Sequence, residues 1–418
     1  MSFEYTNLTN VGRQRDHNED TFVCDSELGL FVLCDGMGGH AAGEVASELA
    51  ANTVREVIGE NRGVLRDLEQ VDSQGNRARI PALIVEAVET ACARVFAAAQ
   101  ADPRKAGMGT TLEMVLVVGH VGFMGHVGDS RLYLKRDGEV HQLSEDHSFV
   151  REMVRAGAIT EEQAKHSQVK NVITRAVGLE ETVKVDTLVF DLLPGDTLLL
   201  CSDGLSDYLK DEAELATLLT EGALDADAQR LIDLANERGG KDNITTLLIR
   251  ASSDERPERL ATVRGVELKM DVLKRVRLFK HLTYKELVML LNLTDLEVRD
   301  AKATVITEGE HDTDFYIVVD GRVAVTQQGH PLAELSQGDH FGEMELIVAR
   351  SRSATVTTIT RARFLTIRRD EFIALLKANE HLAVKLLWSF LQTLSVRLHS
   401  ANKRLSAVGD DAEPSSPF

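Results

Sequence analysis

Acidic residues at the ends of apolar stretches are the first feature of this sequence that could do chemistry. The stretch FVLCDGMGG ends an apolar run in Asp35 and Gly36, and LLLCSDG repeats the arrangement at Asp203. Three further aspartates stand next to or within two residues of glycine, serine or asparagine, namely Asp20 in RQRDHNED, Asp129 in GHVGDSR and Asp242 in GGKDNIT. A single Asp-Gly pair is most often only a turn. Turns alone do not explain why apolar strands repeatedly end in acids.

Carboxylates gathered at strand ends suit a hard divalent cation. Without a cation, neighbouring carboxylates repel one another and take up protons. Mg²⁺ and Mn²⁺ prefer oxygen ligands, and water fills the octahedral positions that the protein leaves open. Glycine lets the backbone approach an ion closely, so the carbonyl of Gly36 is a further candidate ligand. The residue types therefore predict an oxygen-rich site for Mn²⁺ or Mg²⁺.

The elements that must position these acids are strands and two long helices. Strands are predicted for the runs GLFVLCD, EMVLVVGHVGFMGHVGDSRLYLK, DTLVFDLLPGDTLLLCSDG and NITTLLIRA. Apolar residues at three-to-four spacing predict helices over 41–58 and 79–100. Asp137-Gly138 predicts a hairpin turn, and LPGD at 193–196 predicts another turn. This combination favours two packed antiparallel sheets with helices outside them.

Composition and charge limit the binding partners and the cellular location that we expect for this protein. Residues 251–418 hold 23 Lys and Arg against 24 Asp and Glu, so residues 1–250 carry −18 of the net charge of −19. Such an acidic half argues against nucleic acid as a partner. The N-terminus MSFEYTNLTN lacks the pattern of a signal peptide, and no run approaches the length of a membrane span. Cys34 and Cys201 lie in apolar runs and are predicted to be buried free thiols, so we expect a cytoplasmic protein without a membrane partner.

The 418 residues are enough for two or three domains. The polar stretch ASSDERPERLATVRG at 251–265 predicts a linker between a first domain over 1–250 and a second over 266–405. The tail 406–418 is predicted to be disordered because it is polar and rich in Ser, Pro and acids.

The acidic motifs stand in an order that resembles metal-dependent type 2C serine/threonine protein phosphatases. In that order the sequence reads GRQRDHNED, DGMGGHAAGE, GTTL, GDSRLY, DHS, ITRAVG, CSDGL and GGKDNIT. The resemblance spans about residues 5–250 and implies an α+β fold, an αββα four-layer sandwich with a two-metal cleft at one end. It further implies an enzyme that hydrolyses phosphomonoesters of phosphorylated proteins with a metal-activated water.

The resemblance also implies roles for individual residues. The implied ligands of two or three Mn²⁺ or Mg²⁺ ions are Asp20, Asp35, Gly36, Asp129, Asp203 and Asp242. Asp35 would bridge two ions, with Asp203 and Asp242 completing one of them and the carbonyl of Gly36 the other.

Two more positions follow from the same resemblance. Asp20 would hold metal-bound water, and Asp129, together with Asp203, matches a third-ion position of bacterial members. Arg15 matches the arginine that binds the phosphate and, with Asp35, is the catalytic candidate. Many members carry a histidine directly after the Asp-Gly pair, where this sequence has Met37, so the acid that protonates the leaving oxygen stays unassigned.

The second half of the chain has a different pattern. Short alternating strands between glycines over about 305–359 predict a small β-barrel or jelly roll. FGEMELIVARSRSATV resembles the phosphate-binding cassette of cyclic nucleotide-binding domains, over about 266–404 with flanking helices. The resemblance implies a nucleotide pocket with Gly342, Glu343, Arg352 and Ser353, and a cyclic nucleotide effector, with cyclic AMP favoured over cyclic GMP. Glu345 departs from the family pattern, where a small residue is common, and would weaken binding if it pointed inward.

Three functions remain open on the sequence alone. The first is an active phosphatase regulated by a cyclic nucleotide. The second is a nucleotide-sensing scaffold with little catalysis, and the third is an active phosphatase whose barrel mediates assembly without binding nucleotide. The helical pattern after residue 370, which includes Trp388 and Phe390, is expected to pack on the barrel.

Overall fold

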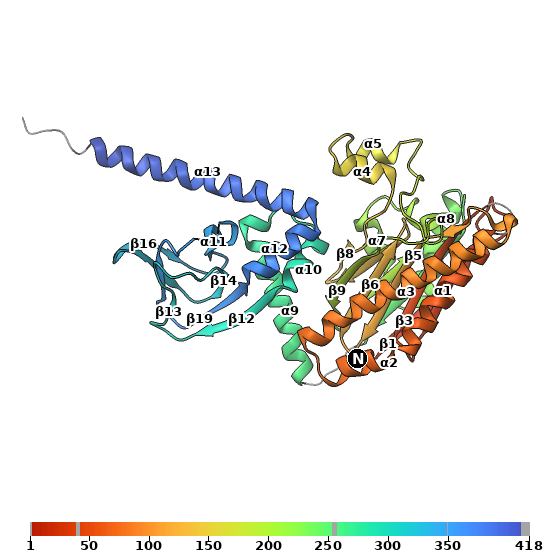
Figure 1. The fold of residues 1–418 in the computed structure, drawn as a ribbon, viewed down its shortest axis with the longest axis horizontal. Helices are drawn as coiled ribbons and strands as arrows, with labels where there is room; N and C mark the ends of the chain where they lie inside the picture. Colours follow the sequence, from red (N-terminus) through yellow and green to blue (C-terminus); the bar gives the residue numbers. More distant parts are fainter. Residues whose placement is uncertain (1, 39–41, 253–256, 349, 411–418) are drawn as a thin grey trace, which may run out of the picture. The chain divides into compact units, whose positions relative to one another are not determined.

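The chain forms two compact units (Figure 1). The computed structural model describes residues 2–38, 42–252, 257–348 and 350–410. The first unit comprises Met1–Val263 and the second Arg264–Phe418.

Two antiparallel sheets form the centre of the first unit. One has the strand order β1-β11-β10-β7-β8, with bounds β1 Phe3–Asn10, β7 Arg131–Arg136, β8 Glu139–Gln142, β10 Thr197–Cys201 and β11 Ile244–Ala251. The other has the order β2-β3-β5-β6-β9, with bounds β2 Asp20–Asp25, β3 Leu30–Met37, β5 Leu112–Val118, β6 Val121–Val127 and β9 Asp186–Asp191, and β4 Gly109–Thr110 pairs with β3. Phe31 of β3 meets the rings of Phe3 and Tyr5 of β1 edge-on at 5.6 and 5.3 Å, which joins the two sheets through an apolar contact.

Helices cover both outer faces of this pair of sheets (Figure 1). On the face of β3, β5 and β6 lie α1 Ala42–Glu60, α2 Arg62–Gln70 and α3 Gln74–Ala101; on the other sheet lie α7 Glu212–Leu218 and α8 Leu224–Glu237. Small buried residues of α1 such as Ala46 and Ala50 let this helix approach the sheet closely. The predicted αββα sandwich is confirmed, and both predicted long helices are present. Shorter helices are η1 Pro103–Lys105, α4 Phe149–Arg155, α5 Glu161–Lys165 and α6 Asp203–Ser206.

The predicted turns and thiols are also confirmed. Asp137 and Gly138 both have positive φ, 52° and 79°, as a tight turn between β7 and β8 requires. Gly195 of the LPGD turn has φ 90° and connects β9 to β10. Cys34 and Cys201 are buried free thiols.

The second unit contains two four-stranded antiparallel sheets, as predicted for a jelly roll. One has the order β12-β19-β14-β17, with bounds β12 Thr294–Arg299, β14 Phe315–Asp320, β17 His340–Phe341 and β19 Ala362–Ile367. The other has the order β13-β18-β15-β16, with bounds β13 Thr304–Ile306, β15 Val323–Gln327, β16 His330–Leu335 and β18 Thr355–Thr358. Tyr316, Phe341 and Phe364 pack their rings together in the core between these strands.

Helices flank and interrupt the barrel. Before it come α9 Pro257–Arg275, η2 Arg277–Phe279 and α10 Tyr284–Leu291; α11 Glu343–Ile347 lies within it, and α12 Arg369–Ala378 and α13 Glu380–Asp410 follow. Thr283 and Glu286 form a capping box that fixes the start of α10, because each side chain accepts a hydrogen bond from the other's backbone N–H.

The predicted linker and tail differ from the structure in part. Helix α9 begins at Pro257, so the second half of the predicted linker 251–265 is helical, and proline suits a first helical turn because its missing N–H would have no partner there. Residues 253–256 lie outside the described residues. Helix α13 continues to Asp410, so the first residues of the predicted disordered tail 406–418 are helical. Residues 411–418 also lie outside the described part.

One packing expectation for α13 is wrong. Phe390 is 3% exposed, as expected for a residue that packs on its own domain, but Trp388 is 61% exposed. Residues two apart lie about 200° apart around a helix, so the two rings cannot share one face.

Candidate active site

Asp20 and Asp35 face each other on neighbouring strands. They are paired residues of β2 and β3. The backbone of Asp35 is held from the far side, where its carbonyl accepts hydrogen bonds from the N–H of Thr111 and the hydroxyl of Thr110, both at 2.9 Å. A side chain on Gly36 would place its Cβ 2.2 Å from the carbonyl oxygen of Gly43, so only glycine fits at that position. Asp129 follows β6 at the same edge of this sheet, where Val127 pairs with Leu112.

Asp203 and Asp242 come from the second sheet. Asp203 begins α6 directly after β10, and Asp242 stands just before β11, which pairs with β10. A Cβ on Gly204 would lie 2.0 Å from the carbonyl oxygen of Asn243, so glycine lets these two segments touch. The amide of Asn243 also donates to the carbonyls of Val11 and His17, both at 3.0 Å, and ties the RQRDHNED loop to this edge.

Hydroxyl groups connect the acids of the two sheets. One carboxylate oxygen of Asp20, Oδ2, accepts hydrogen bonds from Ser202 Oγ at 2.9 Å and from Thr245 Oγ1 at 2.6 Å. Thr245 lies in β11 and Ser202 directly follows β10, so both donors come from the same edge of the second sheet as Asp203 and Asp242. Sequence reasoning missed Ser202, Thr245 and Asn243, although each stands next to or near a predicted ligand in a quoted motif.

The five aspartates act on one another electrostatically. The pKa of Asp35 is raised well above its ordinary value by burial, and next by the charges of the other four aspartates. Burial also raises the pKa of Asp203 strongly, with further contributions from Asp129 and Asp242 among others. Burial raises the pKa values of Asp20 and Asp129 to about 6. The structure thus brings together the carboxylates that the sequence placed far apart.

The fit of this cluster to cations rests on its oxygens. Asp20 Oδ1 and Asp203 Oδ1 are buried and have no hydrogen-bond partner. A buried carboxylate oxygen without a partner is unfavourable, and a cation removes that penalty. Within the described part of the chain, no three His, Cys, Asp or Glu side chains form a ready-made metal site. The donor set fits Mn²⁺ or Mg²⁺ in chemistry, because both ions prefer carboxylate oxygens.

Arg15 lies beside the acids but is already paired. Its Nη2 donates to Asp242 Oδ2 at 2.6 Å, and about half of its side chain is exposed. The predicted phosphate-binding arginine and a predicted metal ligand therefore form an ion pair with each other.

In the second unit, Arg352 lies at the predicted nucleotide pocket. Like Arg15, it is already bonded to carboxylates of the protein. Its side chain is almost fully buried. Its Nη2 donates to Asp312 Oδ2 at 2.6 Å and to the carbonyl oxygen of Asp314 at 2.7 Å, and its Nη1 donates to Glu345 Oε2 at 3.2 Å. Glu345 thus points inward, and two carboxylates balance the charge that a cyclic phosphate would use.

The other predicted pocket residues differ in how far they are exposed to solvent. Gly342 precedes α11 with φ 83°, and a Cβ there would lie 2.6 Å from Arg352 Nη1, so glycine allows the guanidinium to approach the start of this short helix. Glu343 is buried in the first turn of α11. Ser353 is exposed, and its backbone carbonyl accepts a hydrogen bond from Gln327 Nε2 at 3.0 Å.

Comparisons with known proteins agree with this geometry. The family described as Protein phosphatase 2C matches residues 12–248, more than half of the chain. The serine/threonine phosphatase stp of Listeria innocua is 37% identical over 245 residues, which are 58% of this chain and 93% of that protein. The chain belongs to the protein phosphatase 2C family. It is a protein serine/threonine phosphatase, and the predicted enzyme class is confirmed.

Solved structures of bacterial serine/threonine phosphatases share the fold of the first unit. The serine/threonine phosphatase PstP/Ppp of Mycobacterium tuberculosis is 34% identical, with a TM-score of 0.53, over 60% of this chain and 99% of that one. The serine/threonine phosphatase of S. agalactiae is 38% identical, with a TM-score of 0.52, over 60% of this chain and all of that one. These similarities confirm the αββα sandwich.

The second unit also has a family. Residues 297–379 match the cyclic nucleotide-binding domain, so the type 2C phosphatase carries such a domain after its catalytic unit. None of the helices in the described part of the chain has both the length and the apolar character needed to cross a bilayer.

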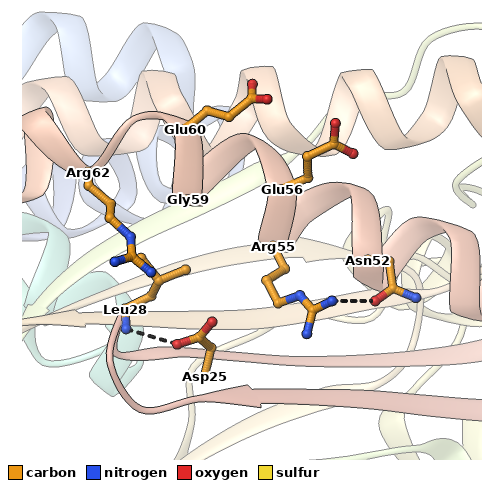
Figure 2. A pocket seen from close by; sticks show the side chains of 8 residues that line it. All are labelled: Asp25, Leu28, Asn52, Arg55, Glu56, Gly59, Glu60 and Arg62. Carbon is orange, nitrogen blue, oxygen red and sulfur yellow. Dashed lines mark hydrogen bonds between the residues drawn. The ribbon is translucent and has the colours of Figure 1, made fainter.

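An open pocket elsewhere on the phosphatase unit does not belong to the acidic cluster. It has a volume of about 610 Å³ and lies between α1 and the turn that joins β2 to β3 (Figure 2). Two charged side chains that line this pocket bond to other lining residues. Arg55 donates to the side chain of Asn52, and Asp25 accepts from the backbone N–H of Leu28 (Figure 2). None of the predicted site residues lines it.

Proposed function

We propose that this type 2C phosphatase hydrolyses phosphoserine and phosphothreonine in proteins at the acidic cluster, with two or three Mn²⁺ or Mg²⁺ ions. The observation that carries the proposal is the pair of buried, unpartnered carboxylate oxygens on Asp20 and Asp203. Asp20 lies in β2 and Asp203 follows β10, which belong to different sheets. Two separate segments of the chain therefore each contribute a buried carboxylate oxygen that a cation could bind.

The proposed metal ligands are Asp20, Asp35, Gly36, Asp129, Asp203 and Asp242. Bound ions lower the pKa of a coordinated water and neutralise charge on the phosphoryl oxygens. The protein's own contribution is position: Ser202 and Thr245 hold Asp20, and the backbone around Asp35 is fixed from the neighbouring strand. Preorganised carboxylates need no rearrangement of the main chain when substrate arrives.

Arg15 is proposed to bind the phosphate of the substrate. A guanidinium offers two parallel N–H groups to phosphate oxygens. For this role its ion pair with Asp242 must open. An ion on Asp242 would favour that opening, because the carboxylate charge would then be shared with the metal.

Turnover of a phosphothreonine peptide by the full chain tests the active site. We expect activity with Mn²⁺, loss of activity on chelation and recovery when Mn²⁺ is restored. Asp203→Asn should reduce turnover by at least about 100-fold, since one mispositioned or missing electrostatic group costs about that much.

A matched control is the same substitution at another buried aspartate. Asp196 is bonded through both oxygens to Arg136, at 2.9 and 2.5 Å, and belongs to the LPGD turn. Asp196→Asn should lower stability but keep metal-dependent turnover in the folded fraction. Chelator-resistant turnover, or an active Asp203→Asn variant, would refute the assignment of the acidic cluster.

We also propose that the second unit binds a cyclic nucleotide that regulates the phosphatase, with cyclic AMP favoured. The family match and the arrangement of Gly342, Glu343 and Arg352 around α11 support this second proposal. The ion pairs of Arg352 with Asp312 and Glu345 set its main condition, because a cyclic phosphate must displace at least one carboxylate.

Calorimetry on the full chain with cyclic AMP and cyclic GMP tests binding, and turnover in the presence of each tests regulation. We expect binding that Arg352→Ala abolishes. A ligand shifts an equilibrium only by its differential affinity for two states, so binding without a change in turnover would show that the units are uncoupled. If the chain binds neither nucleotide at millimolar concentration, the proposal of nucleotide regulation is wrong.

A further inference from the structure

A buried histidine, His147, holds both backbone polar groups of the residue that precedes Asp129. The backbone N–H of His147 donates to the carbonyl oxygen of Gly128 at 2.8 Å. The N–H of Gly128 donates in turn to the ring nitrogen Nδ1 of His147 at 3.1 Å. His147 is 5% exposed, so water does not compete for these bonds. The two hydrogen bonds fix the path of the chain where it leaves β6.

This support matters because Gly128 has an unusual backbone conformation. Its φ is 112°, and a Cβ there would lie 2.7 Å from the side chain of Thr111, so only glycine fits. On the other side of Asp129, Ser130 Oγ lies 2.8 Å from Thr111 Oγ1, which also accepts a hydrogen bond from the N–H of Asp35 at 3.0 Å. Asp129 therefore stands between two residues that are each held in place.

The hydrogen bonds of His147 select one form of its ring. The N–H of Gly128 can only donate to Nδ1, so the proton of the neutral ring lies on Nε2. Nε2 is 3.3 Å from Asp186 Oδ2 and donates to it. Arg175 Nη1 is 3.0 Å from Nε2, but a guanidinium only donates, and its acceptor is Asp186 Oδ1 at 2.9 Å. Burial lowers the pKa of His147 to about 4, so the ring is neutral at pH 7.

A second buried histidine keeps His147 in this position. The ring of His126 packs against that of His147, with 4.6 Å between the centroids. His126 Nδ1 lies 2.7 Å from Glu113 Oε2, and its Nε2 donates to the carbonyl oxygen of Glu145 at 2.9 Å. Glu113 and His126 are paired residues of β5 and β6, and both are fully buried. The segment that carries His147 is thus bound to the same two strands that precede the acidic cluster.

We propose that His147 is a positioning residue of the phosphatase, which holds the backbone of Gly128 and thereby fixes the carboxylate of Asp129 for a divalent cation. This inference rests on the proposed function, in which Asp129 is one of the metal ligands. Residues that orient a metal ligand typically contribute about 10–100-fold to metal affinity or activity. In this role His147 acts through Gly128 and not on the substrate.

Two neutral substitutions separate this role from simple packing. His147→Asn keeps an oxygen acceptor near the position of Nδ1 but does not reach Asp186. His147→Gln reaches toward Asp186 but has no acceptor at the position of Nδ1. Both remove the ring that packs on His126, so both should lower stability. Only His147→Gln removes the acceptor of the Gly128 N–H, so only this variant should loosen Asp129.

Calorimetric titration of Mn²⁺ into the metal-free full chain measures the effect, and circular dichroism checks that each variant is folded. Asp129→Asn identifies the ion that depends on Asp129. For that ion, His147→Gln should raise the dissociation constant about 10–100-fold, whereas His147→Asn should stay close to the wild type. The Mn²⁺ concentration for half-maximal turnover of a phosphothreonine peptide should rise in parallel, with little change in the KM for the peptide at saturating Mn²⁺.

His120→Gln is the matched control. His120 lies in the turn between β5 and β6, at the opposite end of β6 from Asp129, and this variant should bind Mn²⁺ as the wild type does. Normal Mn²⁺ binding by His147→Gln, or a stronger defect in His147→Asn than in His147→Gln, would overturn the inference. If Asp129→Asn and Asp203→Asn impair binding in that case, the proposed function stands without it. Unchanged binding in both aspartate variants would refute the proposed ligands and the inference together.

Discussion

Replacing Asp20 by Asn should make the metal-free phosphatase more stable while it impairs catalysis. Asn keeps the size of the side chain and an oxygen for Ser202 and Thr245, but removes the buried charge. A carboxylate that serves the fold would give the opposite result, because losing its charge would lose its partners. The sign of the stability change therefore separates a metal-binding acid from a structural one.

The size of the effect follows from the pKa of Asp20. Burial raises this pKa from 3.8 to about 6, and each pKa unit corresponds to about 1.4 kcal/mol. Keeping the carboxylate ionised at pH 7.5 thus costs the metal-free protein up to about 3 kcal/mol. This pKa already includes the hydrogen bonds from Ser202 and Thr245, which lower it. An amide is not the same as a protonated carboxyl, and its poorer match to the buried site offsets part of the gain, at roughly 1 kcal/mol. We expect Asp20→Asn to raise the free energy of unfolding by about 1–2 kcal/mol.

The pH dependence has a definite sign. Because the pKa is higher in the folded than in the unfolded state, the folded protein binds the proton more tightly between pH 4 and 6. Stability of the metal-free wild type should fall as the pH rises through this window. The difference between the variant and the wild type should be full above pH 6 and vanish near pH 4.

Calorimetry in the presence of a chelator measures this difference as a shift of the phosphatase unit's melting temperature by roughly 3–6 °C. Tryptophan fluorescence would not serve, because the only tryptophan lies in the second unit. With saturating Mn²⁺ the order should reverse, since the ion stabilises the wild type by mass action. Asp196→Asn is the control and should destabilise by about 3 kcal/mol with or without Mn²⁺. If Asp20→Asn destabilised the metal-free protein in the same way, the reasoning would be refuted.

Three further outcomes are expected. Arg15→Ala should raise the KM for a phosphopeptide at least 10-fold and change the apparent Mn²⁺ affinity less; an unchanged KM in a folded variant would make Arg15 a structural residue. Gly204→Ala should lower the melting temperature of the phosphatase unit by several degrees, because the new Cβ would lie 2.0 Å from the carbonyl of Asn243; an unaltered melting temperature would contradict the close contact. Glu345→Gln should tighten cyclic AMP binding about 10-fold in calorimetry by removing a competitor for Arg352, and weaker binding would show that Glu345 helps to form the pocket.

Local patterns in the sequence predicted the fold well. Alternating apolar runs and turn residues such as Asp137-Gly138 predicted strands and a hairpin, because backbone conformation at a turn depends on a few adjacent residues. The three-to-four spacing predicted α1 and α3. The order of the acidic motifs along the sequence was sufficient to indicate the type 2C phosphatase family. The cyclic nucleotide-binding domain was recognised in the same way.

Local patterns failed where a partner lies far away in the chain. The sequence marked Arg15 and Arg352 as phosphate-binding candidates, but not that Asp242 and Glu345 pair with them. The same holds for the support of Asp20 by Ser202, which is 182 residues away. Charge and hydrogen-bonding capacity belong to a residue type, whereas the choice of partner depends on distance in three dimensions.

Helix α13 shows the same division between sequence and structure. The sequence by itself determined that apolar residues recur with helical spacing after residue 370, because helix geometry fixes which residues share a face. It did not determine which of these apolar residues the domain would cover, and Trp388 was wrongly expected to pack on the barrel. Only the tertiary structure decided that Phe390 is buried and Trp388 exposed. Periodicity defines a face, but burial depends on what packs against it.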